Sequence, residues 1–170
     1  MLSDRGLKVE YADAALSPVI RAVDSKGDYT FVVTCDEPKL GVRTLRKLKE
    51  DAAAGNAKHL IVVCPLGLTH FAHKENAYTS EDAHISTEIF RKSELSFNVT
   101  RHELVPAYTA LTSQQKKILL SKLSCTTGQL PKMREHDPVA RYYRFPKGTV
   151  LKIDRSIGAL EPNTYFRIVA

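Results

Sequence analysis

The chain has 170 residues, of which 43% are hydrophobic and 26% charged, a composition typical of one globular core or two smaller ones. No apolar run approaches the roughly 18 residues of a membrane span, and the first residues lack the apolar stretch of a secretory signal. We therefore expect an intracellular protein without a membrane partner and without disulfides.

The net charge of +6 is unevenly distributed along the chain. Residues 1–98 carry 13 Lys and Arg against 14 Asp and Glu, a net of −1, whereas residues 99–170 carry 12 against 5, a net of +7. The asymmetry favours a two-part chain whose carboxyl half meets an acidic partner, either nucleic acid or an acidic protein surface. A solvated basic face without a specific partner is the alternative.

Two short runs in the first half, residues 29–34 and 59–64, are rich in β-branched and aromatic residues and predict buried strands. The apolar residues between them recur at spacings of three and four, as on one face of a helix: Val42, Leu45, Leu48 and Ala52. Gly55 stands where this helix should end. A strand, a helix and a strand in this order predict a βαβ unit with parallel strands and a right-handed crossover.

Further strands are predicted over residues 84–90 and 95–99, the second because Leu95, Phe97 and Val99 alternate onto one face. The first half is therefore predicted to be α/β. A domain boundary is expected near residue 98, which gives domains at 1–97 and 98–170.

The carboxyl half is predicted to be a small α+β unit. Thr112 and Gln115 form a capping box that begins a helix with Ile118, Leu119 and Leu123 on one stripe. Asp137 and Pro138 are suited to the cap and first position of a short helix. Residues 148–154 and 164–169 predict strands. Residues 98–108, which lack a helical period and contain Pro106, are interpreted as the join between the two halves.

The sequence offers no strong catalytic or cofactor motif. The HELVP stretch begins like a zinc-binding HExxH helix, but Pro106 replaces the second ligand and would break the helix. Cys64, His70 and His73 could supply three metal ligands, yet no fourth ligand or supporting carboxylate is identified. We predict no metal, no cofactor and no small-molecule substrate. The three cysteines, Cys35, Cys64 and Cys125, are interpreted as buried small apolar residues.

Residues 36–39 offer one enzymatic alternative. Glu37 and Lys39 have the Glu-x-Lys order with which metal-dependent nucleases place a carboxylate and an ammonium beside a sheet. Pro38 argues against this interpretation, because proline cannot donate to a sheet ladder and should turn the chain away from the strand.

Residues 134–154 combine many polar side chains in one short stretch. Asp137 is explained as a helix cap, which leaves several cations and the tyrosine faces as a docking surface: Arg134, Arg141, Arg144, Lys147, Tyr142 and Tyr143. The alternative is that one or both tyrosines fill a small core.

The blocks HELVP (102–106), QLP (129–131) and DPVARY (137–142) with a following KG resemble a known domain in order and spacing. They resemble the assembly domain of the fifth-subunit family of eukaryotic nuclear RNA polymerases, a domain that archaeal RNA polymerases also possess. Upstream, residues 37–47 and 59–72 resemble the jaw domain of the same family. The resemblance implies a nuclease-like α/β jaw domain at 1–97, shortened at its amino terminus, and an α+β assembly domain at 98–170.

The resemblance implies a non-catalytic subunit that docks on the largest polymerase subunit and contacts the rest of the polymerase core. It implies an assembly interface made of the residues that match the family motifs: His102, Glu103, Leu104, Val105, Pro106, Asp137, Pro138, Val139, Ala140, Arg141 and Tyr142. It further implies that the jaw loop after the second strand lies near downstream duplex DNA, through Thr69, His70, Phe71 and Ala72. The expected location is the nucleus, or the nucleolus if the chain serves polymerase I alone.

The sequence departs from the family pattern at three places, and the changed turn of the docking domain favours a divergent paralogue specialised for one polymerase. The family's longer amino-terminal helix is lost or shortened, His70 replaces a proline of the jaw loop, and residues 155–163 replace the familiar turn between the last two strands. Two alternative functions remain: a free-standing basic nucleic-acid-binding protein, and the metal-dependent nuclease.

Overall fold

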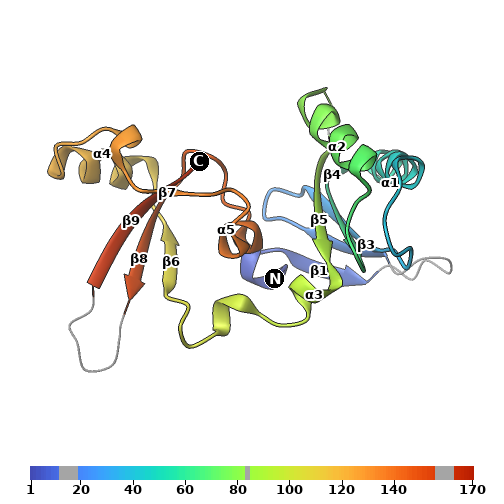
Figure 1. The fold of residues 1–170 in the computed structure, drawn as a ribbon, viewed down its shortest axis with the longest axis horizontal. Helices are drawn as coiled ribbons and strands as arrows, with labels where there is room; N and C mark the ends of the chain where they lie inside the picture. The colour runs from blue at the N-terminus through green and yellow to red at the C-terminus, as the bar shows by residue number, and fades with distance from the viewer. Residues whose placement is uncertain (12–18, 83–84, 156–162) are drawn as a thin grey trace. The chain divides into compact units, whose positions relative to one another are not determined.

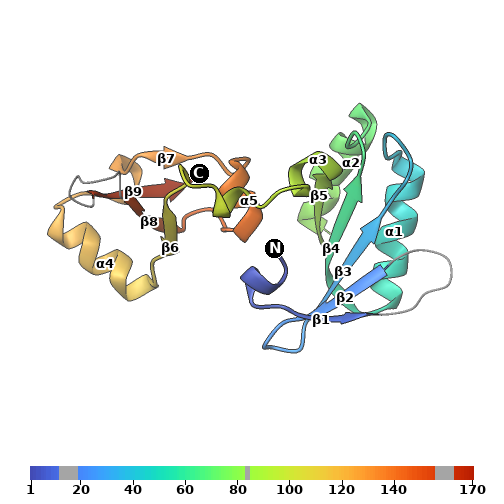
Figure 2. The same cartoon turned by 90° about the horizontal axis from the view of Figure 1, so that it is seen from below.

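The computed structural model describes residues 1–11, 19–82, 85–155 and 163–170. The chain divides into two compact units, Leu2–Phe97 and Asn98–Ala170, which are drawn in Figures 1 and 2. Each unit has its own sheet and its own hydrophobic core. Within the described residues, no helix has the length and hydropathy needed to cross a membrane.

The amino-terminal unit contains a five-stranded sheet in the order β1-β2-β3-β4-β5. Its strands are β1 (Lys8–Tyr11), β2 (Val19–Val23), β3 (Tyr29–Thr34), β4 (Ala57–Cys64) and β5 (Ser86–Arg91). The first three strands are antiparallel, whereas β3, β4 and β5 are parallel. The parallel strands predicted over 29–34 and 59–64 are confirmed, and β5 lies close to the strand predicted over 84–90. The sequence did not predict β1 and β2.

The helices of this unit are α1 (Val42–Ala54), α2 (His70–Asp82), the short α3 (Lys92–Leu95) and a 3₁₀ helix, η1 (Ser3–Arg5). The two long helices pack on one face of the sheet (Figure 2). Leu45 and Ala52 of α1 join Phe31 of β3 and Leu60 of β4 in the core between helix and sheet. The helix predicted from the apolar spacing is thus confirmed, with its buried face as expected.

The strand predicted over residues 95–99 is wrong. Helix α3 ends at Leu95, Phe97 is exposed, and a 3₁₀ helix, η2 (Val99–Arg101), follows. Two local caps override the alternating pattern. Glu94 accepts a hydrogen bond from the Arg91 amide at the start of α3, and the Asn98 side chain accepts one from the Thr100 amide at 3.0 Å.

Gly55 ends α1 for a steric reason. Its φ is −86°, which any residue can adopt, and the left-handed conformation falls instead on Asn56. A Cβ added at Gly55 would lie 2.5 Å from two ring atoms of Phe31. The glycine therefore lets the end of the helix approach the aromatic ring of β3 closely.

We expect Gly55→Ala to lower the free energy of unfolding by about 1–3 kcal/mol, the usual cost of overpacking a core. The matched control is Gly41→Ala at the other end of α1, where an added methyl group meets nothing within 4 Å. That control should cost at most about 0.5 kcal/mol through the weaker cap. Urea denaturation of both variants measures the difference, and equal costs would contradict the contact with Phe31.

The carboxyl-terminal unit contains a four-stranded sheet in the order β6-β8-β9-β7. Its strands are β6 (Ala107–Ala110), β7 (Lys132–Met133), β8 (Val150–Arg155) and β9 (Asn163–Val169). The helices are α4 (Ser113–Lys122), α5 (Pro138–Tyr143), η2 and the 3₁₀ helix η3 (Thr127–Gln129). Strands β8 and β9 and both α-helices are confirmed. The segment 98–108, interpreted as the join between the two halves, begins where the second unit begins and contains η2 and the first residues of β6.

Helix α4 begins as predicted but does not bury the predicted stripe. The Thr112 and Gln115 side chains form the reciprocal capping box. Ile118, however, is 68% exposed, Leu123 is also exposed, and no residue of the helix is buried. The apolar spacing predicted the helix correctly, but it did not predict which face of the helix the rest of the unit covers. The replaced turn at residues 155–163 lies almost wholly outside the described residues.

Candidate assembly interface

The loop 102–106 is a tight turn held by its own hydrogen bonds. The Leu104 amide donates to Nδ1 of His102 at 3.2 Å, and the Val105 amide donates to the His102 carbonyl at 2.9 Å. The turn directs Val105 onto the core of the carboxyl-terminal unit and leaves Leu104 with 77% of its surface exposed. His102 and Glu103 are also exposed, and Pro106 is half-buried. A large apolar side chain on such a rigid turn is typical of a contact point for a partner.

Helix α5 begins with the predicted cap. The Asp137 carboxylate accepts a hydrogen bond from the Val139 amide at 2.9 Å, and Pro138 occupies the first helical position.

The helix buries three residues that were predicted to belong to the assembly interface: Val139, Ala140 and Tyr142. That expectation needs correction, because these side chains are buried within the chain itself and are not available to a partner. Val139 and Ala140 lie in the core cluster of the unit. The predicted residues that remain accessible here are Pro138, which is exposed, and Asp137 and Arg141, which are half-buried.

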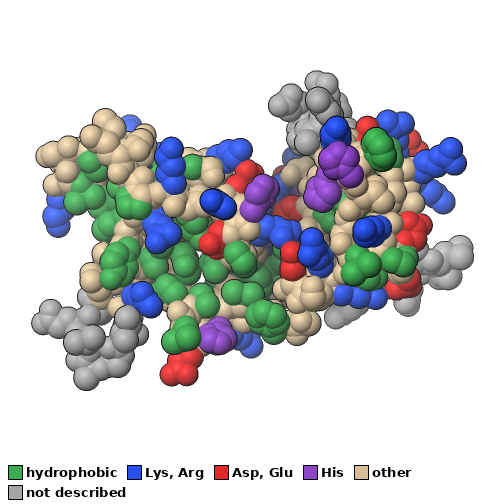
Figure 3. Space-filling view, in the orientation of Figure 1, with side chains coloured by type: hydrophobic (Ala, Val, Ile, Leu, Met, Phe, Trp, Pro, Cys, Tyr) green, Lys and Arg blue, Asp and Glu red, His purple; other side chains and the backbone are tan. Residues whose placement is uncertain are grey.

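The end of α5 presents two aromatic rings. Arg144 adopts the left-handed conformation at φ 57°, and the Phe145 amide donates to the Ala140 carbonyl at 3.0 Å. The chain reversal stacks the rings of Tyr143 and Phe145 with centroids 5.3 Å apart. Both rings are half-buried against the core. Figure 3 shows hydrophobic side chains gathered on the visible face of this unit.

Cations outnumber acids around this surface. Lys147 pairs with Glu135 at 3.1 Å, whereas eight cations of the unit make no ion pair with any described residue: Arg101, Lys116, Lys117, Lys122, Lys132, Arg134, Arg155 and Arg167. Burial raises the pKa of the Tyr108 hydroxyl, and the nearby Asp137 carboxylate raises it further. The unit thus presents apolar and cationic groups, a combination suited to docking against an acidic surface.

Asp137→Ala should lower the free energy of unfolding by about 1 kcal/mol, because it removes the acceptor for the Val139 amide. Asp137→Asn keeps an acceptor at the cap and should lower the free energy of unfolding by only a few tenths of a kcal/mol. Thermal denaturation of the two variants compares them directly. An equal loss in both would show that the charge of Asp137, and not the cap, stabilises the helix.

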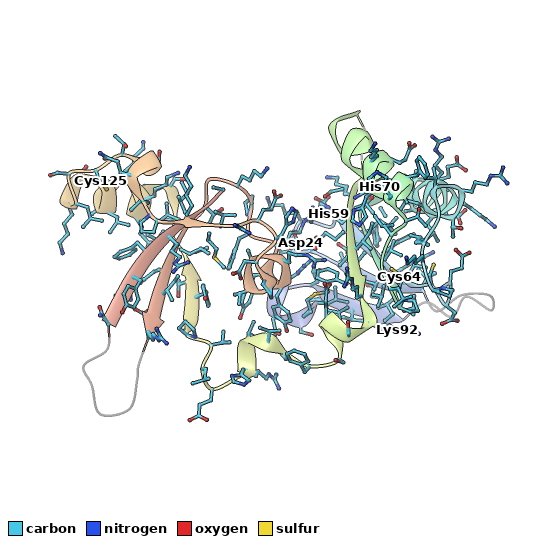
Figure 4. The ribbon with its side chains drawn as sticks, viewed as in Figure 1. Asp24, His59, Cys64, His70, Lys92 and Cys125 are labelled. Carbon is cyan, nitrogen blue, oxygen red and sulfur yellow. The ribbon has the colours of Figure 1, made fainter. Side chains whose placement is uncertain are left out.

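The predicted DNA-proximal residues lie at the start of α2 and do not form a loop. The Thr69 hydroxyl accepts a hydrogen bond from the Ala72 amide at 3.4 Å, and the His73 amide donates to the Thr69 carbonyl, so Thr69 caps the helix. His70 is exposed (Figure 4), and Phe71 is 74% exposed. Ala72 is wholly buried in the core of the amino-terminal unit, so its predicted contact with DNA is not available to its side chain.

Residues 36–39 leave the sheet after β3, as the proline predicted. Glu37 accepts a hydrogen bond from the Thr44 hydroxyl at 3.3 Å, and Asp36 pairs with Lys92 at 3.3 Å. Cys64 is buried, with Sγ 3.8 Å from the Phe90 carbonyl, and burial raises the pKa of its thiol. The described residues hold no cluster of three His, Cys, Asp or Glu side chains placed to bind a metal ion.

Residues 97–169 match the family model described as RNA polymerase Rpb5, C-terminal domain. The chain is also similar to subunit rpabc1 of DNA-directed RNA polymerases I, II and III from Dictyostelium discoideum. The two are 36% identical over 132 residues, which cover 78% of this chain and 67% of that protein. The corresponding subunit of Caenorhabditis elegans is 30% identical over 152 residues, 89% of this chain and 71% of that protein.

The chain has a carboxyl-terminal unit of the type found in a shared RNA polymerase subunit. It belongs to the Rpb5 family, and the resemblance seen in the sequence is confirmed. A subunit 5-like protein of Arabidopsis thaliana is 35% identical over 76% of this chain and 61% of that protein. Among solved structures, EndoMS in its apo form is 18% identical over 51% of this chain and 38% of that chain, with a TM-score of 0.37. That likeness is too low to support a nuclease-like fold for the amino-terminal unit.

Proposed function

We propose that this chain is a non-catalytic subunit of a nuclear DNA-directed RNA polymerase and docks on the largest subunit through residues 98–170. Its relatives are named as subunits shared by polymerases I, II and III, which supports partnership with the polymerase core. The proposed location is the nucleus, because these relatives are subunits of nuclear polymerases. Restriction to one polymerase, and with it a nucleolar location, remains a prediction from the departures in the sequence.

The observation that carries the docking proposal is the conformation of loop 102–106. Leu104 is exposed on a turn that its own hydrogen bonds close, and the next residue, Val105, packs against the core, so the leucine has a fixed support. Such a side chain loses little conformational entropy on binding and buries a large apolar area. Arg141, half-buried on α5, is proposed as a second docking residue of the unit.

The amino-terminal unit is proposed to approach downstream DNA at the start of α2. Thr69, His70 and Phe71 would face the duplex, with the hydroxyl, the imidazole or main-chain amides positioned for phosphate. Contacts of this kind do not read sequence, and a small number of them gives a modest salt dependence.

The docking proposal is tested by copurification with a tagged chain expressed in its own cells. The tagged chain should recover the two large polymerase subunits. Leu104→Asp should reduce that recovery about tenfold or more, as expected for loss of a central apolar contact, and Arg141→Glu should reduce it while leaving the folded state intact.

Ile118→Asp is the matched control, since it introduces the same charge at another exposed apolar residue of the same unit. It should leave recovery unchanged. Failure of the unaltered chain to recover the large subunits would overturn the proposed function. Loss with Ile118→Asp but not with Leu104→Asp would move the docking surface to α4.

A free-standing nucleic-acid-binding protein is the second candidate, favoured by the net charge of +7 over residues 99–170. It predicts tight binding of the isolated chain to a duplex, with affinity falling steeply as salt is raised. Weak binding with a shallow salt slope would support the polymerase subunit instead.

A further inference from the structure

The outer edge of β9 is only partly covered by a neighbouring strand. β8 pairs with β9 along its whole length, from Val150 opposite Ile168 to Arg155 opposite Asn163. β7 pairs with only two residues at the other side, Ile168 and Val169 (Figure 1). Within the described residues, the first part of β9 therefore has a strand on one side only.

The direction of the backbone groups along β9 follows from the bonds at its end. The Val169 amide donates to the Thr149 carbonyl, so Val169 and alternate residues before it face β8. Ile168 and Ala170 instead donate outward, to the carbonyls of Pro131 and Met133. By the same alternation, Thr164 and Phe166 turn their N–H and C=O groups toward the outer edge.

Pro131 ends the pairing on that edge. In a parallel ladder, the next bond would join the N–H of residue 131 to the carbonyl of Phe166, and proline has no N–H. The preceding residue, Leu130, donates its amide back to Thr127 in η3, so the chain turns away. Four backbone groups, the N–H and C=O of Thr164 and Phe166, are left without a partner among the described residues.

The two sides of this sheet differ in how readily another chain could pair with them. β6, at the opposite edge, is only four residues long, which limits pairing with another chain. β9 is seven residues long, and its first five residues, which β7 leaves uncovered, include Tyr165 and Phe166 and no proline. A long aromatic edge of this kind either aggregates or has a dedicated partner.

The side chains beside the open edge indicate the chemistry of that partner. Asn163, Tyr165 and Arg167 point to one face of the sheet, because side chains alternate along a strand. Arg155 points to the same face, because it lies opposite Asn163. The Asn163 side chain donates to the Tyr165 hydroxyl at 3.1 Å and holds the ring, which is 45% exposed. The two arginines make no ion pair with described residues.

The acid on the opposite face is already engaged. Asp154 accepts hydrogen bonds from Lys152 at 2.9 Å and from the Thr164 hydroxyl at 2.8 Å. These hydrogen bonds lower the pKa of Asp154. Tyr165 and Arg167 lie opposite the buried core residues Ile153 and Leu151 of β8, so these cations and the ring form the outer rim of the core-side face. This rim beside the open edge is cationic and aromatic, with no described carboxylate on the neighbouring positions of β8 and β9 that share its face.

We propose that the outer edge of β9 binds an extended acidic segment of another protein, which adds a strand in line with β7. Main-chain bonds to Thr164 and Phe166 supply pairing, acidic side chains lie beside Arg155 and Arg167, and an apolar side chain covers Tyr165. This binding uses no residue of loop 102–106 or α5, so it is independent of the docking proposed above.

The test uses the full 170-residue chain, labelled with nitrogen-15, and a synthetic heptapeptide of alternating valine and glutamate with blocked ends. In the free chain, the amides of Thr164 and Phe166 should exchange with solvent faster than those of Tyr165 and Arg167, which face β8. Adding the peptide should shift and protect the two outward amides. A peptide with lysine in place of glutamate should not bind.

Thr164→Pro removes one outward N–H and should weaken binding of the valine-glutamate peptide about tenfold. Thr164→Val is the matched control, since it loses only the hydroxyl bond to Asp154 and should bind as the unaltered chain does. Arg167→Glu should also weaken binding, by removing one of the two cations beside the edge.

Three results would overturn the proposal. Thr164 and Phe166 amides already protected in the free monomer would show a covered edge. Peptide-induced shifts at loop 102–106 in place of β9 would assign the site elsewhere. Protection that depends on chain concentration, with a dimer in sedimentation, would make the occupant a second copy of this chain.

Discussion

Arg5→Met is expected to lower the free energy of unfolding of the amino-terminal unit by about 3–5 kcal/mol. The Arg5 guanidinium forms two hydrogen bonds with the Glu88 carboxylate, at 3.1 and 2.8 Å, and its side chain is only 6% exposed. Removal of the arginine takes two charge-assisted hydrogen bonds from a largely buried carboxylate, and this loss costs more than the net contribution of the pair itself. The loss should also free η1 from its attachment to β5.

The double variant Arg5→Met with Glu88→Leu tests the physical reason. Because it removes both charges, it should recover most of the stability lost in Arg5→Met. Urea denaturation of the two single variants and the double variant gives the coupling energy between the side chains. Additive losses would mean that Arg5 stabilises the unit through its apolar stem.

The second large effect is expected for Leu151→Ala, at about 2–5 kcal/mol. Leu151 lies on β8, is wholly buried, and belongs to the core cluster formed with Met133, Val139 and Val169. Truncation removes apolar contacts and leaves a cavity in a small core that has few ways to close it. Helix α5 packs on this core, so the docking surface should be lost with it.

The effect of Leu151→Ala is expected in only one of the two units. Each has its own core, so Leu151→Ala should lower the unfolding temperature of the carboxyl-terminal unit and leave that of the amino-terminal unit unchanged. Leu60→Ala, at a wholly buried position of β4, is the reciprocal control. Calorimetry should resolve the two transitions, and a single transition shifted equally by both variants would contradict independent cores.

The sequence predicted elements whose signals are local. The caps at Thr112 and Asp137 and the β-branched runs of β3 and β4 depend on neighbouring residues alone, and the structure contains all of them. Helix α2 was missed because its residues carry no apolar stripe of helical period, and β6 because four mostly exposed residues give no strand pattern.

Burial within the candidate interface could not be predicted from motif matching. Matching treats Leu104 and Val139 alike, although one is largely exposed and the other is in the core. Which of them can reach a partner depends on tertiary contacts across α5 and β8, which no local pattern contains. The open edge of β9 could not be predicted for the same reason, because it depends on β7 pairing with only two residues of β9.

The connectivity of the two sheets has a consequence for synthesis. All five strands of the first sheet come from residues 8–91. The amino-terminal unit can therefore emerge from the ribosome and fold while the remaining chain is still being made. β6, by contrast, can pair only after β8 has been made, and β8 begins at Val150, 40 residues after the end of β6 at Ala110. The positively charged carboxyl-terminal unit therefore folds second, and a partner can bind it only after the amino-terminal unit has folded.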